Sequence, residues 1–194
     1  IKNQFRIEFI RSADYLFKVV LCFYLNCLIW PFRRKSKKRM ARILINEPIT
    51  SSTRVSVLKA LKQIEDREFP ALIVRIDSPG GTVGDSQEIY SAIKRLKDKG
   101  CKVIASFGNI SASGGVYIGV ASDKIVANPG TITGSIGVII RGNNLSELLD
   151  KIGIKFETVK SGIFKDILSP DKPLSEEGRE LLQGLIDESY RQFT

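Results

Sequence analysis

The stretch that decides the fold is ALIVRIDSPGGT, residues 71–82, in which an apolar run ends in a turn made of one proline and two glycines. The apolar part, residues 71–76, has the length and the aliphatic content of a buried strand. After the turn, apolar residues recur at helical spacing along one face, at Ile89, Ala92, Ile93 and Leu96, and Gly100 is a typical residue for the end of that helix. A strand, a glycine turn and an amphipathic helix form the unit from which parallel sheets are built.

The same alternation of strand and helix extends over the rest of the chain from residue 41. Further strands are predicted at residues 41–46, 102–107, 124–127, 136–141 and 155–160. Further helices are predicted at 50–68, 144–152 and 175–193, with a short helix of small residues after the serine motif described below, and Ser175 is the expected cap of the last helix. The alternation predicts an α/β fold with a mainly parallel sheet made of repeated strand–helix units. Because the last helix has no stop signal before Thr194, we expect residues 41–194 to be one domain that is truncated at its C-terminal end.

The net charge of +9 is confined to the start of the 194-residue chain. Residues 1–42 hold eleven lysines and arginines against Glu8 and Asp14, whereas basic and acidic residues balance in the remainder. A nucleic-acid-binding domain would carry its positive charge on the folded body. We therefore expect no nucleic-acid partner.

Residues 15–32 form the longest apolar stretch, which is at the short end of the ~20 residues that a membrane-spanning helix needs. It contains aromatic residues suited to a membrane interface, and the basic run 33–39 that follows would be attracted by anionic lipid. We therefore treat residues 1–40 as a basic, apolar arm with a membrane anchor or a surface-lying segment at 15–32. A single span would leave the body on the cytoplasmic side, but a segment this short does not fix the side of the membrane.

The chain contains no histidine, and its three cysteines lack the spacing of metal ligands. Cys101 opens a predicted strand, where we expect it to behave as a small buried hydrophobe. We expect neither a metal nor a cofactor. The absence of histidine also matters for catalysis, because the usual base for a serine nucleophile is an imidazole.

A candidate nucleophile lies in ISASGG, residues 110–115, between a predicted strand and a helix. Ser113 is followed by Gly114, whose N–H can donate to an oxyanion and which lets a substrate approach the backbone closely. The alternative is that Ser111 or Ser113 only caps the helix. In the absence of histidine, lysine is the known alternative base of serine enzymes.

The candidate base is Lys165, in the loop segment SGIFKD, residues 161–166. A lysine amine accepts a proton only when it is neutral, which requires apolar surroundings. The flanking Ile163 and Phe164 can supply them, and Asp166 opposes this role unless its carboxylate points away. The alternative is a solvated loop lysine.

Two further segments can complete such a site. Gly80 and Gly81 can expose successive N–H groups as an anion-binding nest, which would be the second half of an oxyanion hole. The hydroxyls of residues 131–138 can line a pocket or orient a lysine amine. Each segment is alternatively a plain turn, because proline and glycine favour turns without any function.

The four segments 77–81, 111–115, 134–138 and 161–166 occur in an order and register that resembles the signal peptide peptidase A (SppA) family of bacterial and plastid membrane serine proteases, which has the ClpP/crotonase fold. The resemblance covers roughly residues 41–194, and family members continue past Thr194. It implies the following roles: Ser113, rather than Ser111, as the nucleophile, Lys165 as the general base, Ser135 as the residue that orients the lysine, and Gly80 and Gly114 near the oxyanion.

The resemblance also implies signal peptides and similar apolar peptides as substrates, a homo-oligomer, and a location at a bacterial inner or plastid-type membrane. Two alternatives remain. A crotonase-type acyl-CoA enzyme would use Gly80 and Gly81 on a thioester but would leave Ser113 and Lys165 without roles. A catalytically silent membrane scaffold would bind peptides without needing an intact dyad. We expect a membrane-associated serine endopeptidase with a Ser–Lys dyad.

Overall fold

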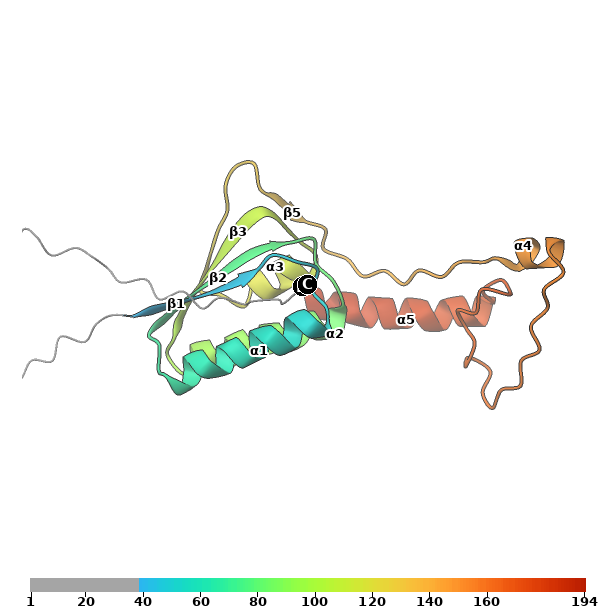
Figure 1. Cartoon of the computed structure of the whole chain (residues 1–194), viewed down its shortest axis with the longest axis horizontal. Coiled ribbons are helices and arrows are strands. Elements are labelled where there is room, and N and C mark those ends of the chain that lie inside the picture. Colours follow the sequence, from blue (N-terminus) through green and yellow to red (C-terminus); the bar gives the residue numbers. More distant parts are fainter. Residues whose placement is uncertain (1–38) are drawn as a thin grey trace, which may run out of the picture. The chain divides into compact units, whose positions relative to one another are not determined.

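Figure 1 shows the computed structural model of the chain, which describes residues 39–194. The predicted membrane anchor at residues 15–32 lies outside the described residues. The described chain divides into two compact units, of which unit 1 ends at Ser135 and unit 2 comprises Ile136–Thr194.

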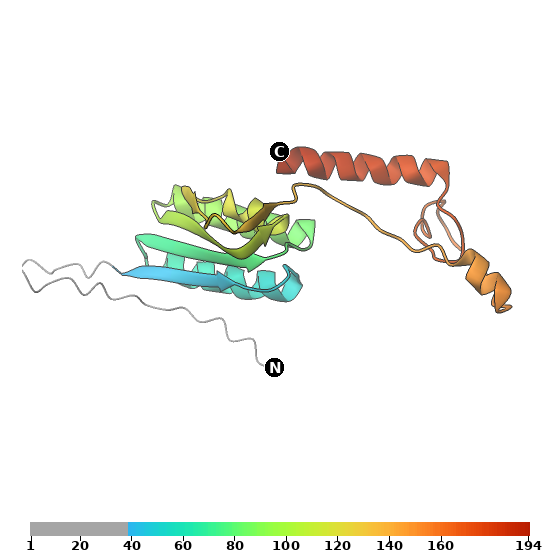
Figure 2. The ribbon, with the colours of Figure 1, turned by 90° about the horizontal axis from the view of Figure 1, so that it is seen from above.

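Unit 1 is a parallel sheet with helices in the connections between its strands. Its strands are β1 (Met40–Ile45), β2 (Ala71–Ser78), β3 (Lys102–Ala112), β4 (Lys124–Val126) and β5 (Ile132–Gly134), and its helices are α1 (Ser51–Asp66), α2 (Val83–Asp98) and α3 (Gly114–Gly119). The strands lie in the order β1-β2-β3-β4, and β5 pairs with the C-terminal end of β3 (Figure 2). All of these pairs are parallel, which confirms the predicted α/β class with alternating strands and helices.

The core of unit 1 lies between the sheet and the helices α1 and α2, which run side by side on one face (Figure 1). Along β1 and β2 every second side chain is buried, so that one face of each strand is closed. The fully buried aliphatic side chains include Leu72, Val74 and Ile76 of β2, Val57 and Ile64 of α1, and Ile89 and Ile93 of α2. Burying each such side chain stabilises the fold by about 1.5–3 kcal/mol relative to leaving it exposed.

α2 follows its prediction closely. The four residues predicted to form its apolar face are all buried. Gly100 comes directly after the C-cap residue Lys99 and has a φ of +92°, the left-handed conformation that ends a helix at little cost for glycine.

β3 continues beyond Phe107, where the predicted strand ends, and the extension carries the serine motif. Asp77 makes the extension possible, because its Oδ1 accepts a hydrogen bond from the Ile110 N–H (3.0 Å) where the register between β2 and β3 shifts. Gly108 leaves room for this carboxylate, since a Cβ at residue 108 would lie 2.5 Å from the Asp77 Cγ. A side chain thus replaces a strand carbonyl at this bulge.

Unit 2 contains two helices, α4 (Ser146–Lys151) and α5 (Glu176–Phe193). Ser175 caps α5, because its Oγ accepts a hydrogen bond from the Gly178 N–H (3.1 Å), as predicted. The helix predicted at residues 144–152 is present as the shorter α4. Across residues 39–194, no helix has the length and apolar content that crossing a membrane requires.

The strands predicted at residues 136–141 and 155–160 are wrong, since neither segment is a strand. Apolar and β-branched residues favour extended backbone there, but a strand also needs a neighbouring strand to pair with its backbone groups. All strand pairing in the described part of the chain belongs to unit 1. Apolar side chains of these two segments are exposed instead, Ile139 at 77% and Val159 completely.

Candidate active site

Ser113 lies in a sharp turn between the end of β3 and the start of α3. Its φ of 49° and ψ of −118° are rare for a residue with a side chain and cost about 1–3 kcal/mol of backbone strain. Two backbone hydrogen bonds hold the turn, because Ser113 N donates to Gly134 O (2.8 Å) and Tyr117 N donates to Ser113 O (3.0 Å). A strained strand-to-helix turn is the backbone geometry that presents the serine nucleophile in α/β-hydrolases.

The structure distinguishes the two serines of the motif. Ser113 is half-buried, whereas Ser111 is fully buried and lies opposite Ser78 in the register of β2 and β3. The Ser111 Oγ has no hydrogen-bond partner among the described residues. Of the two hydroxyl groups, a substrate can therefore reach only that of Ser113.

The two glycines after Pro79 allow two separate close approaches. Gly80 has a φ of +101°, and a Cβ there would lie 2.8 Å from both the Ser113 Cβ and the Gly114 N. A Cβ on Gly81 would overlap the carbonyl oxygen of Ile49. The glycine turn therefore packs directly against the turn that holds Ser113.

Backbone N–H groups gather at this contact. The Gly81 N lies 3.3 Å from the position that a Cβ on Gly114 would take. Gly114 is the first residue of α3, so that its N–H has no carbonyl partner within the helix. The Gly80 N–H, by contrast, donates to the Ser78 Oγ (3.2 Å). Gly81 and Gly114 are therefore the pair of N–H groups best arranged to receive an oxyanion.

Ser135 follows the segment that holds the Ser113 turn. Gly134 accepts the hydrogen bond from Ser113 N and lies opposite Ala112 in the pairing of β3 and β5. Ser135 is exposed, and its φ of 54° is left-handed. Unit 1 thus brings together Ser113, the glycines at 80, 81 and 114, and Ser135.

Lys165 belongs to unit 2 and Ser113 to unit 1, and the pairing of the two side chains stays a prediction. The side chain of Lys165 is exposed, and so are Ile163 and Phe164, at 80% and 39%. The apolar surroundings expected for Lys165 are therefore not supplied by its own loop. The backbone N of Lys165 donates to Gly162 O (3.2 Å) in a turn.

The carboxylate of Asp166 is held by two other lysines. Lys160 Nζ lies 2.6 Å from Asp166 Oδ1, and Lys172 Nζ lies 2.6 Å from Asp166 Oδ2. These hydrogen bonds, that of Lys160 foremost, lower the pKa of Asp166 to about 2. Both carboxylate oxygens are thus engaged away from the neighbouring Lys165.

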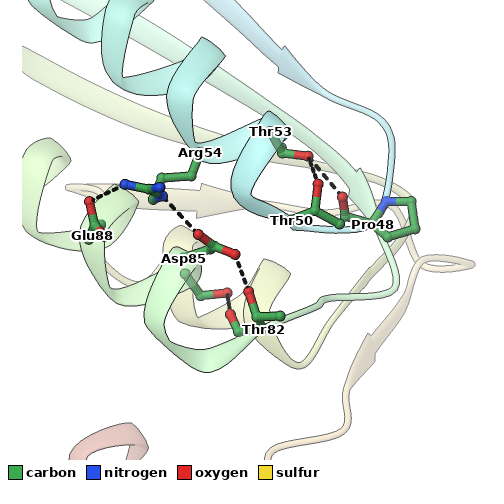
Figure 3. A network of polar contacts seen from close by, with 8 residues as sticks. Pro48, Thr50, Thr53, Arg54, Thr82, Asp85 and Glu88 are labelled. Atoms are coloured by element: carbon green, nitrogen blue, oxygen red, sulfur yellow. Dashed lines mark hydrogen bonds and ion pairs between the residues drawn. The ribbon is translucent and has the colours of Figure 1, made fainter.

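A network of charged and hydroxyl side chains beside the glycine turn was not predicted (Figure 3). Arg54, in the first turn of α1, donates from Nε to Asp85 Oδ1 (2.8 Å) and from Nη1 to Glu88 Oε2 (2.9 Å). Asp85 also accepts, through Oδ2, a hydrogen bond from the Oγ1 of Thr82, the residue immediately before α2. The spacing of Thr82 and Asp85 resembles a capping box and is a signal in the sequence. Nothing in the sequence pairs Asp85 with Arg54.

Other potential sites lie apart from Ser113. In residues 39–194, no group of three or more His, Cys, Asp or Glu side chains is placed to hold a metal ion. Cys101 is buried, as predicted, and burial raises the pKa of its thiol. An open cavity of about 490 Å³ lies next to Cys101, at the C-terminal ends of α1 and α2, and none of the predicted site residues lines it.

Several known proteins resemble this chain over half of its length or more. The profile of peptidase family S49 matches residues 95–194. The protein slr0021 of Synechocystis sp., assigned as a protease, is 60% identical over 166 residues, which are 86% of this chain and 60% of slr0021. A protein of Enterococcus faecium assigned as the signal peptide peptidase SppA is 42% identical over 137 residues, 70% of this chain and 40% of that protein. The chloroplastic serine protease SPPA of Arabidopsis thaliana is 38% identical over 130 residues, 66% of this chain and 19% of that protein.

This chain therefore spans less than two thirds of the length of each of these three relatives. Among solved structures, a ClpP1 variant from Listeria monocytogenes is similar with a TM-score of 0.44 and 20% sequence identity, over 78% of this chain and 75% of that one.

Proposed function

Because this chain belongs to peptidase family S49, we propose that it hydrolyses peptide bonds with Ser113 as the nucleophile and Lys165 as the general base. The observation that carries the proposal is the strained turn of Ser113, which packs against Gly80 beside the N–H groups of Gly81 and Gly114. Relatives of the chain include a serine protease. The chain has no histidine to act as the usual base.

The proposed reaction begins when the Ser113 Oγ attacks the carbonyl carbon of the substrate and the neutral amine of Lys165 takes the hydroxyl proton. The N–H groups of Gly81 and Gly114 donate to the oxyanion that forms, and losing one such donor typically lowers the rate by about 10²–10³-fold. The tetrahedral intermediate then breaks its C–N bond, and the leaving amine of the substrate takes the proton from the protonated Lys165. Water hydrolyses the acyl-enzyme and restores Ser113.

Ser135 would act on Lys165 rather than on the substrate. It comes directly after Gly134, whose carbonyl holds the N–H of Ser113. The hydroxyl that would orient the lysine amine and the nucleophile are therefore attached to one hydrogen-bonded stretch of backbone. Ser135 would steady the amine through a hydrogen bond in the attacking geometry.

The proposed substrates are apolar peptides, with signal peptides among them, bound in extended form through main-chain hydrogen bonds. The assignment of the Enterococcus faecium relative as a signal peptide peptidase supports this class. Membrane association through residues 15–32 would bring the enzyme to such peptides, at a bacterial inner or plastid-type membrane, and the Arabidopsis relative is chloroplastic. We further propose a homo-oligomer.

The test is hydrolysis of a fluorogenic apolar peptide by the full-length protein and four variants. Ser113→Ala and Lys165→Ala should each lower kcat/KM by at least about 10³-fold, because each removes a member of the dyad. Ser111→Ala and Lys155→Ala are the matched controls, since the Ser111 hydroxyl is buried without a partner among residues 39–194 and Lys155 is exposed in unit 2. Both controls should stay within about threefold of the wild type.

A fluorophosphonate probe supplies a second measurement, because it should label Ser113 in the wild type and in the Ser111→Ala control. Activity that survives both Ser113→Ala and Lys165→Ala would overturn the dyad. A folded full-length protein without hydrolysis or labelling would instead favour the catalytically silent scaffold.

A further inference from the structure

The backbone from Gly80 to Thr82 is bridged to Ile49. Ile49 N donates to Gly80 O (2.9 Å), and Thr82 N donates to Ile49 O (3.0 Å). None of the described peptide bonds is cis, and the C=O and N–H of a trans peptide point in opposite directions. The bridge therefore turns the Gly81 N–H away from Ile49. The direction of this N–H depends on how Ile49 sits against the backbone from Gly80 to Thr82, which both hydrogen bonds hold.

The loop that carries Ile49 is anchored to α1 and to β2. The Thr53 Oγ1 donates to Pro48 O (2.9 Å), and the Ser78 Oγ donates to Glu47 O (2.8 Å). Thr53 and Ser78 are both completely buried. Figure 3 shows Thr53 reaching back to Pro48 at the start of α1. Ile49 therefore moves with the first turn of α1.

Arg54 and Asp85 connect that first turn to the start of α2. Arg54 follows Thr53 in the sequence, and Asp85 holds both the Arg54 Nε and the Thr82 Oγ1 (Figure 3). The side chain of Asp85 is 12% exposed and that of Arg54 is 27% exposed. Solvent therefore screens this pair less than it screens an ion pair on the open surface. The pair joins the two segments whose bridge directs the Gly81 N–H.

We infer that Arg54 and Asp85 are positioning residues, which act through Thr82 to hold the Gly81 N–H as an oxyanion donor. The inference rests on the proposed function. The clamp is defined as Arg54, Asp85 and Thr82, and among residues 39–194 its side-chain hydrogen bonds do not include Ser113. Its effect is therefore on the stabilisation of the transition state, so that kcat falls when the clamp is broken and KM stays the same.

Glu88 provides a matched control for Asp85. Both carboxylates accept from Arg54 and both belong to α2, but the Glu88 side chain is 54% exposed and lies outside the clamp. Asp85→Asn should lower kcat by about tenfold, because the donor is displaced rather than lost. Glu88→Gln, the same chemical change, should alter kcat by less than about twofold. KM for the fluorogenic peptide should change by less than about twofold in both.

Thr82 supplies an independent pair of variants. Thr82→Val keeps the shape of the side chain but removes the hydroxyl that Asp85 holds, and its kcat should fall by about tenfold. Thr82→Ser keeps the hydroxyl, and its kcat should stay within about twofold of the wild type. If Asp85→Asn fails to fold, as judged by circular dichroism and thermal melting, the two Thr82 variants test the clamp inference by themselves.

Inhibition by a peptide aldehyde tests the positioning role separately from a structural one. If the clamp only stabilised the fold, the Ki of the aldehyde would not change relative to that of the matching alcohol. It forms a tetrahedral adduct with a serine, and the adduct oxygen occupies the oxyanion position. Its Ki should rise by about tenfold in Asp85→Asn, while the Ki of the matching peptide alcohol, which forms no adduct, should stay unchanged.

The outcomes separate the clamp from the proposed function. If Ser113→Ala is inactive but Asp85→Asn matches Glu88→Gln in kcat and in aldehyde Ki, the clamp inference is overturned and the proposed function stands. Equal kcat in Thr82→Val and Thr82→Ser would also overturn it. If Ser113→Ala hydrolyses the peptide like the wild type, the proposed function fails, and the clamp inference fails with it.

Discussion

At Gly81 the backbone comes so close to Ile49 that a Cβ would overlap its carbonyl oxygen, whereas a Cβ on Gly84 would meet no atom within 4 Å. The first of these two glycines is therefore required by packing against Ile49, and the second is not. This difference has a direct consequence for the site, because Ile49 also sets the direction of the Gly81 N–H.

Gly81→Ala should lower kcat/KM by at least about 10²-fold, because Ile49 must move and the Gly81 donor is displaced. Gly84→Ala should leave kcat/KM unchanged and raise the free energy of unfolding by up to about 1 kcal/mol, since Gly84 lies in α2 without a positive φ. Peptide hydrolysis and urea unfolding of both variants check this. Equal activity in the two would contradict the role given to Gly81.

The choice between Ser113 and Ser111 shows how much of the candidate site can be predicted from the sequence at the scale of single residues. Residue types alone left both serines as candidates, and the resemblance to a family favoured Ser113. The structure adds a physical difference, because Ser111 is buried within β3 while Ser113 occupies a strained turn. Neither burial nor φ at these positions can be read from ISASGG, since both depend on the partner strands.

At the scale of elements, sequence patterns predicted features that lie within one segment. They did not predict which side chains or strands of distant segments pair with one another. The apolar face of α2 and the Ser175 cap of α5 are local features, and both were confirmed. The extension of β3 depends on Asp77, which meets Ile110 from a distant part of the chain. The failed strands at 136–141 and 155–160 have suitable residues but no neighbouring strand. The link from Arg54 to α2 was missed for the same reason.

The loop of residues 160–172 should respond to acid through Asp166. The pKa of Asp166 in the folded protein is about 2, below its ordinary value of about 3.9, because Lys160 and Lys172 bind its charged form. Its contribution to stability is therefore fully present above about pH 4 and is lost as the pH falls through about 2.

Carbon-13 NMR of the Asp166 carboxyl group should give a midpoint near pH 2, and amide shifts of residues 160–172 should follow the same titration. In an Asp166→Asn variant these amides should lose that transition. A carboxyl midpoint near the ordinary value of about 3.9 would show that the two lysines do not hold it in solution.

At the scale of the molecule, the two units differ in what they bury. Unit 1 places aliphatic side chains of β1, β2, α1 and α2 in one core. Among residues 136–194, all of which the structure describes, Gly178 is the one buried residue. Local stability follows buried apolar contact. The free energy of local opening should therefore be higher for the backbone of unit 1 than for that of unit 2.

Hydrogen exchange of the full-length chain, followed by mass spectrometry, measures this difference. Peptides from β1, β2 and α2 should exchange only through large openings, while peptides covering residues 136–141 and 155–160 should exchange at least about 10²-fold faster. Equal protection of the two sets would contradict the exposure of these extended segments.

The hydrogen bond from Ser113 N to Gly134 O joins the turn of Ser113 to a residue that the ribosome adds later. A chain still being synthesised exposes Ser113 before the carbonyl that holds its distorted backbone has emerged. The turn therefore lacks this partner until β5 is complete. Under the proposed function, the order of translation would delay the appearance of a working nucleophile, so that a nascent protease is kept from cutting before its own sheet has closed.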